Sequence, residues 1–299
     1  MIGKQYTTDE HFVPKFYLQN FANDGGQVWV YDRSNKKRFS QIPNNICFKK
    51  DLYETKAEGM NPALGEYVLR NQLEDTFCQY EGAWSKLIKQ VLSTCRLNID
   101  SNALICNTEQ KRQLAEFVSN LILRNPITMK NSELDEISAA KQLEETKAIE
   151  HLFNLLGFGS IDSVLRFINK SNHFNDEFGT QRLLADELLK MDMRFIYNEE
   201  NDFVTSCCPI FYGMREDGSS ITDVIVPLST DVLMLYGISE DTKKYRNRIG
   251  RNPVFSMLLK YLYLFVLPPE KARFIIASNE KHLDIIDKPE SILAYVNSL

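Results

Sequence analysis

Hydrophobic and polar positions divide the chain into strand-like ends around a helical middle. In residues 1–58 the clearest period-2 pattern is Gln27-Val-Trp-Val-Tyr31, which follows the turn signal Asp24-Gly25-Gly26. Successive side chains of this expected strand point to opposite faces. Further short strands are expected at 38–42, 46–48 and 51–53.

Residues 60–200 repeat apolar side chains at helical spacing. Asn61-Pro62 marks a helix start, and the run that follows to Thr94 carries an apolar stripe. A second helix is expected to begin at Thr108, with Thr108 as its N-cap. Additional helices are expected at 131–156, 160–168 and 181–197.

Residues 201–299 return to short apolar strands, expected at 203–206, 222–226, 232–236 and 273–277. The apolar segment Val254–Leu267 contains Lys260 and ends at Pro268-Pro269, so it indicates a buried helix, or a helix followed by a strand. The pattern predicts one α+β domain over 1–299, with an antiparallel sheet built from N- and C-terminal strands and a large central helical region.

Composition narrows the class of protein. Hydrophobic residues make up 43% and charged residues 25% of the 299 positions, as in ordinary soluble globular proteins. A net charge of −5 argues against a nucleic-acid binder that uses its whole surface. No segment approaches the roughly 20 apolar residues of a membrane span, and the N-terminus has no apolar signal region. A cytoplasmic protein without a membrane partner is expected.

Motifs for metals and cofactors are not found. The six cysteines show no CxxC spacing, and none of the four histidines lies near a cysteine pair, so no metal site is expected. The chain also lacks a glycine-rich phosphate cradle, GxSxG, HExxH and a Walker sequence. The cofactor, if the protein uses one, is unknown from the sequence.

The most informative segment is His11-Phe-Val-Pro-Lys-Phe-Tyr-Leu-Gln-Asn-Phe21. Pro14 biases Val13 towards an extended conformation and can itself open a helix. A short helix from about Pro14 to Asn20 would hold His11 at a strand-to-helix corner. Such a corner suits a functional side chain and a structural one equally well.

This segment resembles the start of the bacterial family called domain of unknown function 4238. Members of that family begin with His-x-x-Pro-x-x-Tyr-Leu-x-x-Phe, followed by a strand that ends in Tyr-Asp-Arg. The matching residues here are His11, Pro14, Tyr17, Leu18 and Phe21, then Tyr31-Asp32-Arg33. Looser matches are Glu74 and Glu81 on one helix, Arg124-Asn-Pro126 and Pro227-Leu-Ser229. The resemblance implies a fold and a candidate site but no particular reaction.

One segment departs from the family pattern. Where the family carries Thr-Ser-Asp-Asn-Pro after a strand, this chain has Thr205-Ser-Cys-Cys-Pro209. No carboxylate role transfers to Cys207, so the chain is an inactive or altered member if the family's chemistry needs that aspartate. The two thiols are either a buried pair at a strand end or, with His11 approaching in space, part of a nucleophilic site.

Three residues are the candidates for chemistry. His11 has an ordinary pKa of about 6.5 and can act as acid or base, or it can pin the turn before Pro14. Glu81 lies beside an apolar stripe, either at a solvated margin or partly buried, where it would suit acid–base catalysis or orient a histidine. Arg124 either complements a helix dipole or clamps a phosphate or carboxylate.

The only concentrated basic patch is Lys243-Lys-Tyr-Arg-Asn-Arg-Ile-Gly-Arg251. Such a loop contacts a phosphate backbone or is simply solvated. Its candidate nucleic-acid-binding residues are Lys243, Lys244, Tyr245, Arg246, Arg248 and Arg251.

Two classes of function are consistent with these residues. The first is a hydrolase or nuclease acting on a phosphate-bearing or nucleic-acid substrate, with His11 and Glu81 catalytic and Arg124 binding the anion. The second is a non-catalytic binding or regulatory protein that has lost the family carboxylate at Cys207.

Overall fold

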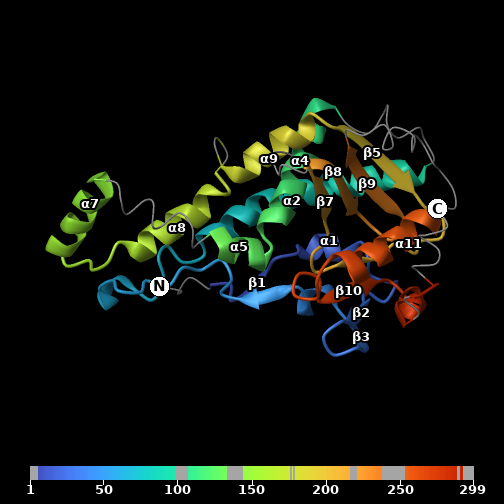
Figure 1. Cartoon of the computed structure of the whole chain (residues 1–299), viewed down its shortest axis with the longest axis horizontal. Helices are drawn as coiled ribbons and strands as arrows, with labels where there is room; N and C mark the ends of the chain where they lie inside the picture. Colours follow the sequence, from blue (N-terminus) through green and yellow to red (C-terminus); the bar gives the residue numbers. More distant parts are fainter. Residues whose placement is uncertain are drawn as a thin grey trace.

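The computed structural model describes residues 6–97, 107–132, 144–175, 177, 179–215, 221–237, 253–287 and 290–291. Within these residues the chain forms three antiparallel sheets together with helices, most of which lie in the middle of the sequence (Figure 1). The predicted α+β class is therefore confirmed. No helix in the described part of the chain is long and apolar enough to cross a membrane.

The N-terminal segment forms the corner that Pro14 predicts. Strand β1 (Asp9–His11) pairs with β4 (Phe48–Lys50), and helix α1 (Lys15–Gln19) begins directly after Pro14. The expected strands at 46–48 and 51–53 are wrong in detail, because the chain is extended at Phe48–Lys50 and turns after it. Cys47 and Asp51 on either side of β4 have positive φ values of 56° and 48°, which ends the strand.

One sheet joins the two ends of the chain, as the sequence predicts. Its strands lie in the order β3 (Lys37–Gln41), β2 (Val28–Asp32), β10 (Phe274–Ala277) and β6 (Thr205–Ser206). Val30 of β2 faces Ile276 of β10 in register. A short 3₁₀ helix, Pro43–Asn45, follows β3, and another, Glu280–Asp287, follows β10.

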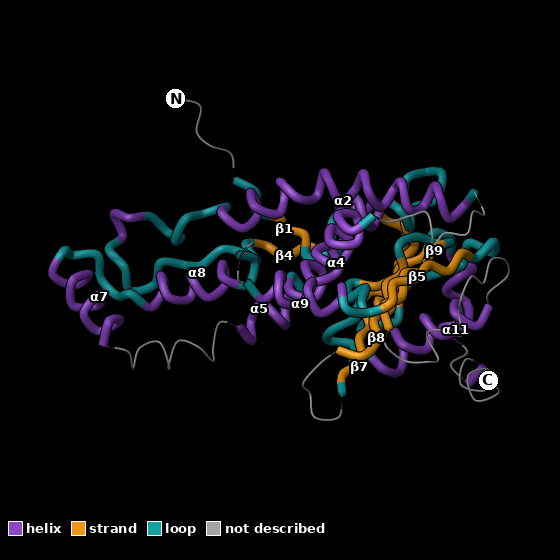
Figure 2. Tube along the Cα trace, turned by 90° about the horizontal axis from the view of Figure 1, so that it is seen from above, coloured by secondary structure: helices purple, strands orange, loops and turns teal. Residues whose placement is uncertain are grey.

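The larger core forms around the sheet of β5 (Asp192–Tyr197), β9 (Val232–Gly237), β8 (Ile221–Pro227) and β7 (Phe211–Met214). Figure 2 shows α2 (Gln72–Arg96), α4 (Thr108–Leu123) and α9 (Thr180–Leu189) on one side of it and α11 (Pro253–Tyr261) on the other.

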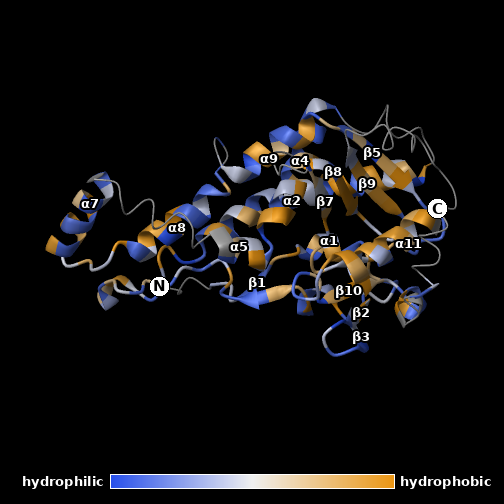
Figure 3. Ribbon diagram, in the orientation of Figure 1, coloured by the Kyte–Doolittle hydropathy of each residue, from blue (hydrophilic) through white to orange (hydrophobic). Residues whose placement is uncertain are grey.

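Alternate residues of β9 pack into two hydrophobic cores, one on each face of this sheet. Val232, Met234 and Tyr236 pack with the α2–α4 side, whereas Leu233 and Leu235 pack with the α11 side. All six residues of β9 are buried, which explains why its sequence is an unbroken apolar run (Figure 3).

Two helix boundaries differ from the sequence expectation. The helix expected at 181–197 is wrong in its second half, because α9 ends at Leu189 and the next apolar run becomes β5, paired along its length with β9. Pro62 opens only the 3₁₀ turn Pro62–Leu64, since Gly65 follows at φ 106°, and α2 begins at Gln72.

Other helices follow the sequence more closely. The N-cap of α4 is Asn107 and not Thr108, because the Asn107 side chain and Gln110 form a reciprocal capping box. The expected helix at 131–156 lies partly outside the described residues, but its second half is helical as α7 (Glu144–Leu155). Of the two structures expected for 254–267, the segment adopts the continuous helix and not a helix followed by a strand. Helix α11 continues into a π-helical turn, Leu262–Val266.

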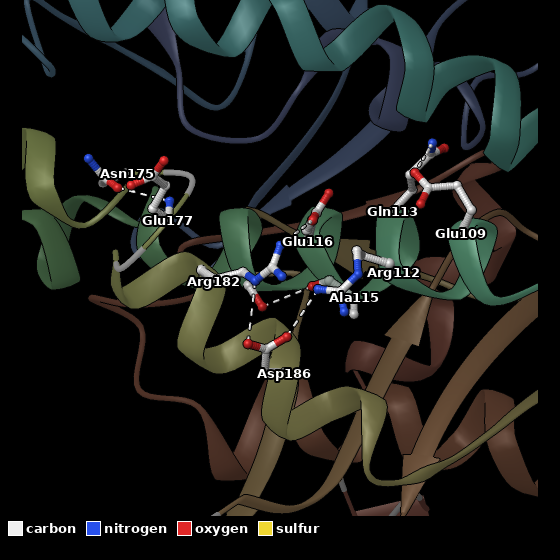
Figure 4. Close-up of polar contacts among 10 residues, drawn as sticks. Glu109, Arg112, Gln113, Ala115, Glu116, Asn175, Glu177, Arg182 and Asp186 are labelled. Carbon is white, nitrogen blue, oxygen red and sulfur yellow. Dashed lines mark hydrogen bonds and ion pairs between the residues drawn. The ribbon is translucent and has the colours of Figure 1, made fainter.

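Helices α4 and α9 lie side by side and are joined by charged side chains at their exposed margin (Figure 4). Asp186 accepts hydrogen bonds from Arg112 of α4 at 3.0 Å and from Arg182 of its own helix at 3.4 Å. Deeper in the contact, the buried Asn120 amide donates to Gln181 at 2.9 Å. The Asn120–Gln181 contact fixes the beginning of α9 against the end of α4, and the Arg112–Asp186 contact fixes the second half of α9 against the first half of α4.

The helices α5 (Pro126–Ser132), α8 (Asp162–Asn172) and α7 extend away from the two larger sheets (Figure 1). Helix α7 lies farthest out, and its side chains Ile149, Leu152 and Leu155 are exposed. The larger core therefore lies at the end of the molecule that contains the two four-stranded sheets.

Candidate functional site

Arg124 ties together three elements that are distant in sequence. Its side chain is only 1% exposed and extends from the C-cap of α4. The guanidinium donates to Glu81 Oε1 at 2.6 Å, to Tyr53 Oη at 3.0 Å and to the His11 carbonyl oxygen at 2.6 Å. It also lies 4.3 Å from the centroid of the Phe77 ring. The donors of Arg124 are thus used within the protein. Its role as an anion clamp stays a prediction.

The imidazole of His11 faces away from this cluster. Its Nε2 lies 3.1 Å from the Asn44 carbonyl oxygen, and its ring centroid lies 5.4 Å from that of Phe48. Because a carbonyl only accepts, Nε2 must carry the hydrogen. Burial lowers the pKa of His11, and the nearby Lys15 charge lowers it further. The structure therefore brings Glu81 to Arg124 but brings only the backbone of His11 to it.

Next to His11 lies a buried carboxyl that the sequence analysis missed. Glu10 is fully buried; its Oε2 accepts the Tyr53 backbone N–H at 2.6 Å, and its Oε1 has no hydrogen-bond partner among the described residues. Burial is the main cause that raises the pKa of Glu10 to about 8, and the negative charges of Glu54 and Glu74 also raise this pKa.

Glu54 and Glu74 share this environment, and burial raises the pKa of each of them as well. Even so, no group of three or more His, Cys, Asp or Glu side chains in the described part of the chain has an arrangement that could hold a metal ion. Nothing in the sequence marks Glu10 as buried, because its burial depends on Tyr53, which lies 43 positions away.

Cys207 occupies the position where the family pattern has an aspartate. Its sulfur accepts the Phe274 N–H at 3.3 Å and lies 3.7 Å from the Lys271 carbonyl oxygen, so it links β6 to the segment before β10. Burial raises the pKa of Cys207, and it raises that of Cys208 to about 11. Both groups are therefore thiols at neutral pH and weak nucleophiles. Cys207 is buried but Cys208 is partly exposed, so the buried-pair interpretation holds for Cys207 alone.

A cavity with a volume of about 880 Å³ lies among the described residues. It lies between the α4–α5 junction, the start of α9, strand β7 and the segment from Leu262 to Lys271, which we call the C-terminal wall. Most lining side chains are apolar. The polar or ionisable ones are Asn125, Thr128, His173, Thr180, Cys208, Tyr212, Asp223 and Lys271.

The pocket covers β7 and β8 differently. On β8 it contacts Asp223 and Ile225, which are two positions apart and so lie on one face. On β7 it contacts the consecutive residues Phe211, Tyr212 and Gly213. Since β7 is the last strand of its sheet, the pocket wraps around the edge of this strand.

Arg33 holds the C-terminal wall in place. Its guanidinium donates to the carbonyl oxygens of Leu264 and Leu267, each at 2.9 Å, and of Ala272 at 3.1 Å. The neighbouring Asp32 carboxylate accepts two hydrogen bonds from Arg273, at 2.7 and 3.2 Å. The Tyr31-Asp32-Arg33 segment thus organises one wall of the pocket from the far end of the sequence.

Other segments singled out by the sequence also meet here. Asn125 comes from the Arg124-Asn-Pro126 segment, and Cys208 and Pro209 come from the segment that departs from the family pattern. Tyr17 donates to the Pro227 carbonyl oxygen at 2.6 Å and contacts Thr205 Oγ1 at 2.8 Å, which joins α1 to the strands behind the pocket.

A second cavity, of about 470 Å³, lies beside Asn44 and is lined by Gln19, Asn23 and Asp24 among others. Neither cavity is lined by His11, Glu81 or Arg124. The basic residues Lys243, Lys244, Tyr245, Arg246, Arg248 and Arg251 lie outside the described residues.

Comparison with known proteins agrees with the opening motif. The model of a family described as "Protein of unknown function (DUF4238)" matches residues 10–275. No curated protein and no solved structure matches the chain.

Proposed function

The chain belongs to the DUF4238 family, and from the geometry of its larger pocket we propose that it binds a small, mostly apolar ligand. The observation that carries this proposal is the cavity of about 880 Å³, mostly apolar with a few polar groups. That size and lining are typical of sites for small molecules. The proposal corresponds to the non-catalytic alternative of the sequence analysis.

The construction of the walls supports it. Arg33 fixes the C-terminal wall through three backbone carbonyls, and the Asn120–Gln181 contact fixes the start of α9. Because these contacts are made within the protein, the cavity is held open by its own framework. A pre-formed cavity spares a ligand the cost of ordering its site.

The test uses Nile red, a neutral apolar dye whose emission rises and shifts to the blue in an apolar site. We expect one-to-one binding to the native chain. Thr128→Trp and Val266→Trp place bulk in the pocket from two different walls and should each weaken binding about tenfold or more. Thr76→Trp on α2, half-buried as Thr128 is but outside the pocket, is the matched control and should bind as the native chain does.

Circular dichroism melting accompanies each variant, so that loss of binding is separated from loss of folding. Equal dye binding by all the variants, or no saturable binding by the native chain, would contradict the proposal.

The hydrolase or nuclease interpretation is the second candidate, and one observation favours it. Burial lowers the pKa of His11, which favours the neutral ring that a base requires. If His11 is the catalytic base, the chain hydrolyses a phosphodiester such as bis(4-nitrophenyl) phosphate and His11→Ala abolishes this activity while the fold is retained. Equal rates for the two proteins would remove His11 from any such mechanism.

A further inference from the structure

The pocket contains one charged side chain, Lys271, that no described residue neutralises. Lys271 lines the cavity, and its ammonium makes no ion pair or hydrogen bond with any part of the chain that the structure describes. The other charged lining residue, Asp223, is already engaged in an interaction within the protein. His173 Nδ1 lies 2.8 Å from Thr180 Oγ1. The available charge in the pocket is therefore positive.

The backbone of Lys271 is fixed while its side chain is exposed. Its N–H donates to the Pro268 carbonyl oxygen at 3.0 Å, and its own carbonyl receives the Cys207 thiol at 3.7 Å. Arg33 binds the carbonyl of the next residue, Ala272. The lysine thus stands at a defined point on the C-terminal wall, and its hydrated ammonium can move over the cavity mouth.

The ammonium of Lys271 lies close enough to Cys208 for its charge to act on that thiol. Burial is the main influence on Cys208 and raises its pKa to about 11, but the Lys271 charge is close enough to act in the opposite direction. Cys208 lines the cavity beside Pro209 and Ile210. Apolar side chains of β8, α4 and the π-helical turn also line the cavity, for example Ile225, Ile122 and Leu262.

We infer that the ligand is an apolar carboxylate, with its carboxylate at Lys271 and its apolar body among the side chains of β8, α4 and the C-terminal wall. This inference rests on the proposed function and names the chemical class of its ligand. A charge-assisted hydrogen bond from lysine favours an anion over a neutral polar head of equal size. An apolar body removes its own surface and that of the cavity lining from water.

A carboxylate on an apolar body has two sources, a free acid or the C-terminus of an apolar peptide. The probes are therefore decanoate, 1-decanol, and the peptide acetyl-Gly-Leu-Leu-Leu with a free or an amidated C-terminus. Each is titrated against the native chain at pH 8 with displacement of Nile red as the readout.

We expect decanoate to bind about tenfold or more tightly than 1-decanol, as for other charge-assisted contacts. Lys271→Met, which keeps the length of the side chain, should bring this ratio to about twofold or less without changing the affinity for 1-decanol. Lys56→Met removes an exposed lysine outside the pocket and should leave the ratio unchanged. A preference for the free peptide over its amide, larger than that for decanoate over decanol, would assign the carboxylate to a peptide.

Equal affinities for decanoate and 1-decanol in the native chain, or a ratio that Lys271→Met does not alter, would overturn the inference and leave the apolar pocket intact. Absence of Nile red binding, with no effect of any probe on the melting temperature, would instead show that the proposed function fails.

Discussion

At the scale of single residues, the buried cation of Arg124 connects three segments that are distant in sequence. Its guanidinium satisfies Glu81, Tyr53 and the His11 carbonyl at the same time, in a site that is almost inaccessible to water. The fork geometry of arginine makes this arrangement specific, because the ammonium of lysine is a single point of charge.

Replacement of Arg124 by lysine should therefore lower the free energy of unfolding by about 3 kcal/mol, since buried polar groups lose their donors. Urea denaturation of the two proteins measures the difference. Arg182→Lys changes a partly exposed arginine whose ion pairs lie at 3.4 and 3.9 Å, and it should cost less than about 1 kcal/mol. Similar losses for the two variants would show that Arg124 is not a structural tie.

Glu10 makes the free energy of unfolding depend on pH. Its pKa is raised from an ordinary 4.5 to about 8, so between these values the folded state binds a proton that the unfolded state has lost. This contribution to stability is complete below about pH 4.5 and disappears as pH rises through about 8. Glu54, Glu74, Lys15 and Arg124 are the charged groups around this part of the site.

Glu10→Gln keeps the shape of the side chain and cannot ionise. We expect the free energy of unfolding to fall less steeply between pH 5 and pH 8 in this variant, by at most about 1.4 kcal/mol per pH unit. Urea denaturation across that range measures the slope. Glu145→Gln on α7 removes an exposed carboxyl and should not change it. An unchanged slope in Glu10→Gln would mean that Glu10 is ionised in the folded protein.

At the scale of elements, the C-terminal wall depends on a strand from the opposite end of the chain. Arg33 follows β2 and binds three carbonyl oxygens of a segment more than 230 positions later. Without these contacts the segment between α11 and β10 loses its main polar connection to the sheet.

Arg33→Lys should therefore weaken Nile red binding about threefold to tenfold, because an ammonium reaches fewer of these carbonyls and the wall becomes less ordered. The far-ultraviolet circular dichroism of the folded protein should stay the same. Arg38→Lys on neighbouring β3 is the matched control, since Arg38 binds Asp284 and the Leu283 carbonyl and not the wall. Loss of dye binding in both variants would point to general destabilisation of the sheet.

The elements also show where sequence reasoning succeeds. The Val28–Asp32 strand was predictable because its side chains alternate between two faces, and Val232–Gly237 because its short apolar run is bounded by Asp231 and Gly237. The junction of α9 and β5 was not, because a short apolar run suits a helix or a strand and only its pairing with β9 decides between them.

The candidate site was predictable only in part, for a related reason. Glu81 and Arg124 were singled out and do lie together. Glu10 and Lys271 were not, and Arg33 was named only as part of the family pattern, because their environments are made by residues brought from distant parts of the chain. Local spacing carries no information about burial of that kind.

At the scale of the whole molecule, the two halves of the sequence are interleaved. The sheet of β3, β2, β10 and β6 takes strands from residues 28–41 and 205–277. The core on the α2–α4 side includes residues from the first and last hundred positions, and Trp29 and Tyr31 pack against the core on the α11 side. This arrangement accords with the prediction of one domain over 1–299, which stays a prediction.

The pairing of β2 with β10 has a consequence for synthesis. Val28–Asp32 can form a hairpin with β3 as soon as both leave the ribosome, but its other edge pairs with Phe274–Ala277. For most of translation that hairpin presents unpaired backbone donors and acceptors to the cytosol of any cell that makes it, the kind of surface on which chains aggregate. A holding chaperone therefore has a defined early target in this nascent chain.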